Sequence, residues 1–136
     1  MQDTNQLTDL SNIKRFNFGH TQEVSDKCLD KVLNGKMTAC CWNAVRGHQD
    51  SFPGTYFVIK DWNSKDRVVI RVTKLEEKHL NEVDSVYSNA EGYNDLNEWR
   101  EMISKYFKSE SSIDSKFFYT PNMKIFTMYF NIVSIL

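Results

Sequence analysis

The residues best suited to chemistry lie in one stretch, Leu29 to Arg46, with the sequence LDKVLNGKMTACCWNAVR. A helical pattern ends there at Gly35, and a strand-like run begins about two residues later. The strand would present Thr38, Cys40, Trp42 and Ala44 on one face and Met37, Ala39, Cys41 and Asn43 on the other. A site at this junction would combine a tight glycine turn, the side chains that follow it and one face of the strand.

The helix before this stretch has defined ends in the sequence. Thr21 is the expected N-cap, and Gly35 stands where a left-handed C-cap belongs. The residues at the spacing of one apolar helix face are Val24, Cys28, Val32 and Leu33. We therefore expect a helix that stops just before the candidate site.

Length and composition indicate one globular domain. The chain has 136 residues, of which 40% are hydrophobic and 26% charged. Residues 1–12 are polar and lack periodicity. We therefore expect a mobile or loosely docked polar N-terminal segment over residues 1–15 and a single domain over residues 16–136.

The net charge of −1 argues against a protein that grips duplex nucleic acid mainly by neutralising phosphates. Residues 1–80 carry 12 Lys and Arg against 10 Asp and Glu, whereas residues 81–136 carry 5 against 8. An anionic ligand is therefore better placed on the first half.

The cysteines indicate a reducing compartment. Cys28, Cys40 and Cys41 are odd in number, and the adjacent pair is poorly placed to form a disulfide. We expect reduced thiols in a cytoplasmic protein. The histidines at 20, 48 and 79 form no spaced cluster with the cysteines, so we predict no metal site and no cofactor.

Neither end of the sequence predicts membrane attachment. The N-terminal MQDTNQLTDLSN is polar and acidic, unlike a secretory leader. The apolar C-terminus, residues 125–136, is too short to span a bilayer, and we interpret it as a buried strand.

Two β-branched and aromatic runs, residues 55–60 and 67–75, predict a hairpin around a turn-like DWNSKD. Alternation in the second run places Arg71 on the face opposite Val68, Ile70 and Val72. Arg71 is therefore a candidate for a charged group facing a ligand; the alternative is a solvated arginine at the rim of a barrel.

A strong amphipathic helix is expected to begin at Asp95, where Glu98 completes a capping-box pattern. Its apolar face contains Leu96, Trp99, Met102, Ile103, Tyr106 and Phe107, which we interpret as core packing. Strands cluster in the middle of the chain and helices lie to the sides. This order favours an α+β fold, a small and mostly antiparallel β-barrel with flanking helices, over a doubly wound parallel sheet.

The sequence resembles the ASCH domains, a branch of the PUA-like β-barrels, over about residues 16–134. The matching pieces are Phe18-Gly19, residues 32–39, Val69-Ile70-Arg71, residues 82–84, Ala90-Glu91-Gly92, Asp95-Leu96, Trp99-Arg100, Asn122-Met123 and residues 130–133. The resemblance implies a PUA-like fold and a role with RNA. Similar modules bind RNA in a cleft between the barrel and the first helix, and some members hydrolyse acetylated cytidine or cleave RNA.

The family signature runs glycine, any residue, lysine, two residues, an acidic residue or threonine, one residue, then arginine or a small polar residue. The corresponding positions here are Gly35, Met37, Cys40 and Trp42, so three of the four depart from it. In the amidohydrolase members a lysine, a threonine and a later glutamate act together as an activated nucleophile system. The resemblance places that glutamate at Glu91.

The resemblance leaves the nucleophile open. Cys40 replaces the threonine, and a thiolate would need its pKa lowered from roughly 8.5 by a cation such as Lys36 or Arg46. Alternatively, Cys40 is a small buried apolar residue, which we favour because the lysine is also lost. Thr38 is a further candidate hydroxyl group.

Trp42 has two interpretations: it stacks on a nucleobase, or it fills the space of a lost substrate contact. The basic and aromatic residues of the hairpin suit a single-stranded or nucleotide ligand, although an ordinary solvated hairpin would have the same composition. These residues are Tyr56, Lys60, Trp62, Lys65, Arg67, Arg71 and Lys74.

The leading hypothesis is an ASCH domain that binds RNA or a nucleotide-like ligand in a cleft bounded by residues 35–42, Arg46, Arg71 and Glu91. The alternative is a hydrolase that acts on a modified nucleoside with an amide of the N4-acetylcytidine type, or a ribonuclease. Its Glu91 would be the acid and base, with Cys40 or Thr38 as nucleophile. A third hypothesis is a protein-interaction module with a vestigial cleft.

Overall fold

The fold comes from a computed structural model, which describes residues 10–136. Its elements in chain order are β1 (Lys14–Phe16), α2 (Gln22–Leu33), β2 (Ala39–Asn43), the 3-10 helix η1 (Ala44–Arg46), β3 (Tyr56–Lys60), β4 (Asp66–His79), the 3-10 helix η2 (Leu80–Glu82), α3 (Ser85–Ala90), α4 (Leu96–Ile113) and β5 (Lys124–Ile135). Most of the expected N-terminal segment, residues 1–9, lies outside the described residues.

The five strands form one sheet, in the order β1-β3-β4-β5-β2, that curls into a half-barrel. The pair β1–β3 is parallel, and the other neighbours are antiparallel. The predicted hairpin is confirmed as β3 and β4, although β4 continues to His79. The predicted α+β fold, a mostly antiparallel curled sheet with flanking helices, is therefore confirmed. No helix within residues 10–136 is long and apolar enough to cross a membrane.

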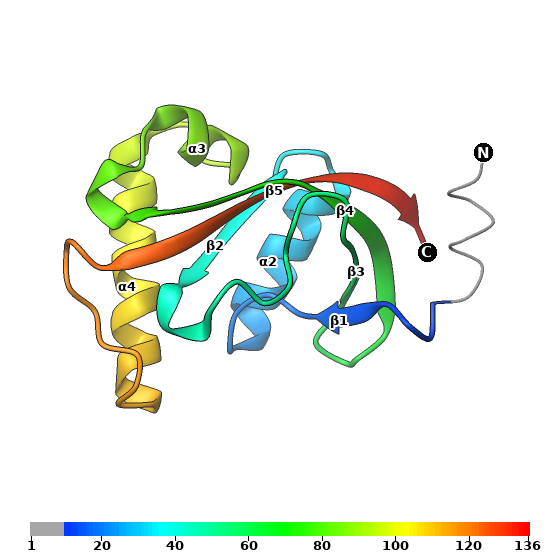
Figure 1. Cartoon of the computed structure of the whole chain (residues 1–136), viewed down its shortest axis with the longest axis horizontal. Coiled ribbons are helices and arrows are strands. Elements are labelled where there is room, and N and C mark those ends of the chain that lie inside the picture. Colours follow the sequence, from blue (N-terminus) through cyan, green and yellow to red (C-terminus); the bar gives the residue numbers. More distant parts are fainter. Residues whose placement is uncertain (1–9) are drawn as a thin grey trace.

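Two apolar cores lie on either side of β2. Figure 1 shows α2 within the curve of the sheet, whereas α3 and α4 cover the end of the sheet away from the C-terminus. The first core packs α2 against the sheet and includes Cys40, with Trp42 at its margin. The second packs α3 and α4 against β5 and includes Ala39, with Cys41 at its margin. Consecutive residues of β2 therefore face different cores.

The caps predicted for α2 are confirmed. The Thr21 side chain accepts a hydrogen bond from the Val24 amide, 3.3 Å long, at the N-terminus. At the C-terminus Gly35 has a φ of +75°. The amides of Gly35 and Lys36 donate to the carbonyls of Val32 and Lys31, at 3.0 and 2.8 Å. This is the Schellman arrangement, whose left-handed residue is best supplied by glycine, and it ends the helix directly before the candidate site.

Helix α4 begins at the predicted N-cap, since the Asp95 side chain accepts a 2.8 Å hydrogen bond from the Asn97 amide. Its predicted apolar face enters the second core through Trp99, Ile103 and Phe107, which are all buried. The helix continues to Ile113, so the serine-rich run after residue 109 still forms its last turn. One edge of this helix faces β2 and helps to form the cleft described below.

Candidate functional site

A cleft lies between the segment that enters α2, strand β2 and helix α4. It consists of two adjoining hollows of about 290 and 280 Å³. Both are lined by Phe18, Gly19, Cys40, Cys41 and Tyr106. The first hollow also contacts Trp42 and Arg46, and the second contacts Glu91 and Trp99. The cleft is therefore continuous along β2, with different chemistry at its two ends.

Glu91 is held in the second hollow by two donors from different elements. It occupies the C-cap position of α3, and its Oε2 accepts a 2.9 Å hydrogen bond from Trp99 Nε1 in α4. The same oxygen lies 3.8 Å from Cys41 Sγ in β2, which acts as a weaker thiol donor. The carboxyl group is thus fixed between the two helices and the strand, facing the hollow.

Burial sets the protonation of this carboxyl group. Desolvation raises the pKa of Glu91 from 4.5 to about 7, because the ionised form loses contact with water. The Tyr87 hydroxyl, the Trp99 indole and the Lys31 ammonium each oppose that rise. A carboxyl group with this pKa exists in both forms near neutral pH, so it can donate or accept a proton or a hydrogen bond.

The thiols around Glu91 are held in their neutral form. Burial, reinforced by the negative charge of Glu91, raises the pKa of Cys40 and Cys41 well above the ordinary value for a thiol. The same causes raise the pKa of Cys28 to about 11. A thiolate is the nucleophilic form of cysteine, so these side chains are poor nucleophiles at neutral pH. Within residues 10–136, no group of three or more His, Cys, Asp and Glu residues is arranged to hold a metal ion.

The structure brings some of the predicted site residues to the cleft and leaves others outside it. Those that line the hollows are Met37, Cys40, Trp42, Arg46 and Glu91. Those absent from both linings are Gly35, Lys36, Thr38 and Arg71. Met37 is buried in the wall of the second hollow, where the family pattern has its lysine.

Thr38 precedes the regular strand, which begins at Ala39, and its side chain contacts the end of α3 instead of lining either hollow. Its amide donates to the Ala90 carbonyl at 2.7 Å, and its exposed hydroxyl contacts the same oxygen at 3.4 Å. The alternation expected for residues 37–44 therefore holds over 39–43, and Thr38 does not share the face of Cys40.

Arg71 is an exposed residue in the middle of β4, where it pairs with Tyr56 of β3 and Asn131 of β5. It lines neither hollow. Alternation correctly predicted that Arg71 lies on the face of β4 opposite the buried Val68 and Ile70. The face that carries Arg71, however, does not line the cleft.

The cation that acts on Glu91 is Lys31, whose charge opposes the rise in the pKa of that carboxyl group. The sequence pattern did not predict this role for Lys31. Its Nζ lies 4.1 Å from the centre of the Tyr93 ring. Its stem crosses Gly92, where a Cβ would lie 3.1 Å from Lys31 Cδ, and Gly92 has a φ of +96°. Glycine at this position lets α2 approach the Glu91 loop closely. Lys31 is six residues before the motif position of the family lysine, on a different element.

Trp42 and Arg46 form the far wall of the first hollow. The Trp42 indole donates a 2.8 Å hydrogen bond to the Gly47 carbonyl and stacks on Phe126, with ring centres 5.8 Å apart. Arg46 Nη2 forms a 2.7 Å ion pair with Oε2 of Glu110, whose side chain is buried. Trp42 therefore secures the turn that carries Arg46.

Sequence reasoning missed the roles of Trp99 and Cys41. Both were assigned from periodicity, Trp99 to the core and Cys41 to the face opposite Cys40. One available signal was that a buried indole N–H needs an acceptor, and Glu91 lies eight residues before Trp99, ahead of the Asp95 cap. Which thiol meets Glu91 depends on the packing of α3 against β2, and periodicity does not specify that packing.

Comparison with known proteins agrees with this architecture. The family model described as "ASCH domain" matches residues 14–134. The chain is similar to the crystal structure of a protein from Enterococcus faecalis V583, described by the family model DUF984. The TM-score is 0.83 and the identity 28%, over 98% of this chain and 83% of that one. It also has the fold of an ASCH domain from Lactobacillus crispatus JV V101. The TM-score there is 0.80 and the identity 20%, over 96% and 84% of the two chains. A search of curated proteins found no match.

Proposed function

We propose that this chain, which belongs to the ASCH domain family, binds RNA or a nucleotide-like ligand by taking one nucleoside unit into the cleft along β2. The observation that carries the proposal is the pair of adjoining hollows with a fixed carboxyl group at one end. Ligand sites in proteins are typically concave, mostly apolar and furnished with a few fixed polar groups.

The walls of the cleft suit a flat heterocycle. Phe18 and Tyr106 line both hollows, and Trp42 lines the first. Aromatic side chains stack on nucleobases with little sequence preference, at roughly 1–3 kcal/mol per base. Glu91 adds a group that can donate and accept hydrogen bonds, as the polar edge of a base requires. Together these features support recognition of a single base rather than of a duplex.

The test is a titration of the full chain with a short fluorescent single-stranded RNA, followed by competition with free cytidine. We expect saturable binding that cytidine displaces. Glu91→Gln, which keeps the shape but loses the ionisable group, should weaken both affinities by about tenfold. Glu98→Gln is the matched control, because Glu98 is exposed in the first turn of α4 and lines neither hollow. Binding that is unaffected by Glu91→Gln would contradict the proposal.

A second candidate function, hydrolysis of an amide on a modified nucleoside, rests on the protonation of Glu91. A pKa of about 7 suits a general acid and base at neutral pH. The thiols are neutral, so we assign the attack to water. Glu91 would take the proton as the oxygen adds to the acyl carbon, then pass it to the departing amine, giving a free carboxylic acid and the unmodified nucleoside.

Mass spectrometry of the products from N4-acetylcytidine tests this second function. Turnover that Glu91→Gln abolishes and Cys40→Ala preserves would support it. Loss of turnover on Cys40→Ala, with binding intact, would instead favour the thiol as nucleophile. For either function we propose a cytoplasmic location, which is consistent with three free cysteines.

A further inference from the structure

We propose that the cleft binds a phosphorylated nucleotide in one orientation, with the phosphate at Arg46 and the base toward Glu91. This inference rests on the proposed function and names its ligand class: a nucleotide rather than an unphosphorylated nucleoside.

The two hollows differ in charge. Lys14, Arg15 and Arg46 line the first hollow, and no carboxylate of residues 10–136 lines it. The second is lined by the Glu91 carboxyl group, together with Lys105 and His20. An anionic group is therefore better stabilised in the first hollow, while a hydrogen-bonding base edge is better placed beside Glu91.

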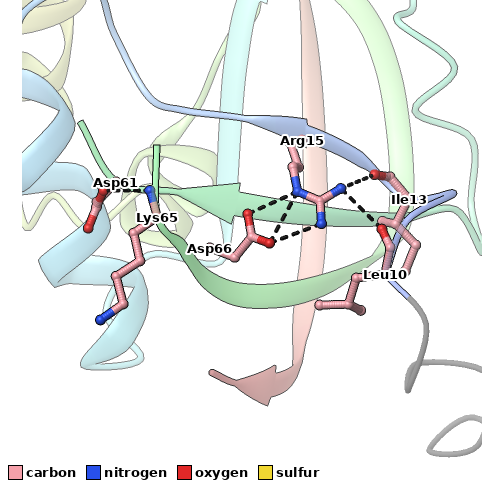
Figure 2. Close-up of polar contacts among 6 residues, drawn as sticks. All are labelled: Leu10, Ile13, Arg15, Asp61, Lys65 and Asp66. Carbon is pink, nitrogen blue, oxygen red and sulfur yellow. Dashed lines mark hydrogen bonds and ion pairs between the residues drawn. The ribbon is translucent and has the colours of Figure 1, made fainter. Parts of the chain in front are cut away.

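Two of the three cations in the first hollow are already engaged. Figure 2 shows Arg15 with its Nε and Nη2 donating to Asp66 and its Nη1 donating to the carbonyls of Leu10 and Ile13. Lys14 forms an exposed ion pair with Asp50. These contacts leave Arg15 with a structural role that ties the β1 segment to the start of β4.

Arg46 retains free donors. Its guanidinium makes one hydrogen bond within the described residues, from Nη2 to Glu110, and its side chain is 42% exposed. The remaining N–H groups offer the planar fork with which arginine binds phosphate through two parallel hydrogen bonds. We assign the phosphate to Arg46 because it is a guanidinium fixed at one end with donors left over. Arg15, by contrast, is held by Asp66 and two carbonyls, and Lys14 is an exposed ammonium paired with Asp50.

The guanidinium is also held in place before any ligand arrives. It lies 4.5 Å from the centre of the Phe117 ring, and its turn is secured by the Trp42 hydrogen bond to Gly47. The Gln49 side chain donates to the Arg46 carbonyl from the other side. A donor that is already oriented loses little entropy on binding, which favours recognition of a small anion.

Glu110 is the positioning residue for Arg46. It is 4% exposed and outside the lining of both hollows, so it orients the guanidinium without facing the proposed phosphate. Because Glu110 offsets the charge of Arg46, the phosphate would gain mainly directed hydrogen bonds. We therefore expect a gain of about tenfold in affinity rather than several orders of magnitude.

The test compares cytidine with cytidine 5′-monophosphate by titration calorimetry on the full chain at one ionic strength. The unaltered protein should bind the monophosphate about tenfold more tightly. In Arg46→Gln the ratio of the two affinities should fall to about one. Arg67→Gln is the matched control. Arg67 belongs to the hairpin whose composition suited a ligand, but the structure places it outside both hollows, where its side chain is 37% exposed and pairs with Asp61 at 3.5 Å. The ratio should therefore stay near ten.

Arg46→Gln alone leaves the buried Glu110 carboxylate without its cation and should destabilise the fold. The double variant Arg46→Gln/Glu110→Gln removes that unpaired charge and controls for misfolding. Its ratio of monophosphate affinity to cytidine affinity should also be near one. Equal affinities in the unaltered protein would overturn the orientation while leaving the proposed function intact. A preference that survives Arg46→Gln would also overturn it. If neither compound binds, the proposed function fails, and this inference fails with it.

Discussion

The Trp99 indole donates a 2.9 Å hydrogen bond to the Glu91 carboxyl group across the gap between α4 and the end of α3. Trp99 is fully buried, and the same carboxyl group faces the cleft. One contact thus joins the second apolar core to the chemistry of the candidate site. Changes to this core should be measurable as changes in the protonation of Glu91.

Trp99→Phe removes the donor and keeps an aromatic ring. Because a hydrogen bond to the ionised form lowers a carboxyl pKa, its loss should raise the pKa of Glu91 above about 7. The smaller ring and the lost bond should also cost about 1–3 kcal/mol of unfolding free energy. Carbon-13 NMR of the Glu91 carboxyl carbon measures the pKa. Trp62→Phe, at a site 40% exposed, is the control, and an unchanged or lower Glu91 pKa in Trp99→Phe would contradict the account.

Glu91 should make the fold less stable as the pH rises. The folded state holds its proton up to a pKa of about 7, compared with 4.5 when unfolded. Its contribution is therefore full below pH 4.5 and is lost as the pH passes through about 7. Relative to Glu91→Gln, the unaltered protein should lose roughly 2–3 kcal/mol of unfolding free energy between pH 5 and pH 8. Urea unfolding of both proteins at pH 5 and pH 8 measures this loss. An unaltered protein whose stability relative to Glu91→Gln stays constant or rises with pH would refute the burial of an ionisable Glu91.

The thiols of Cys40 and Cys41 should react slowly in the native protein. Their pKa values lie well above the ordinary value, so the reactive thiolate is scarce at pH 7.5. Iodoacetamide labelling followed by mass spectrometry should modify both at least tenfold more slowly than in urea. Native labelling as fast as in urea would return a cysteine nucleophile to consideration.

Removing Arg46 should destabilise the fold more than removing Glu110, because only Glu110 is buried in this ion pair. Arg46→Gln leaves a buried carboxylate without its cation and should cost about 2–4 kcal/mol of unfolding free energy. Glu110→Gln leaves a guanidinium that is 42% exposed and can be solvated, so its cost should stay within about 1 kcal/mol. Urea denaturation of the two variants tests this order, and the reverse order would show that Glu110 is not the buried member.

Local sequence signals were sufficient to predict the helix and the strand that carry the candidate site. Thr21 and Gly35 predicted both ends of α2, because caps depend on residues within a few positions of each other. The alternation of Ala39, Cys40 and Cys41 likewise predicted their opposite faces once the strand began. The family resemblance correctly predicted the PUA-like α+β fold, although the sheet is a half-barrel rather than a closed barrel.

The pairings inside the cleft could not be predicted in this way. Glu91 meets Trp99 and Cys41 only after α3, α4 and β2 have packed together. Arg71 shows the converse case: alternation assigned it a face of β4, but the curl of the sheet determines where that face points. Such relationships depend on tertiary packing between segments that are far apart in the sequence.

The most direct test of the account uses the three tryptophans as reporters. Trp42 lines the first hollow and Trp99 the second, whereas Trp62 lies in a separate surface depression between α2 and the β3–β4 turn. The measurement is an NMR titration of the indole N–H signals of the nitrogen-15-labelled protein with cytidine 5′-monophosphate. We predict that the Trp42 and Trp99 signals shift along one saturable curve while the Trp62 signal stays fixed. Saturable shifts of Trp62 alone, or no shifts at nucleotide concentrations up to solubility, would contradict a nucleotide site in this cleft.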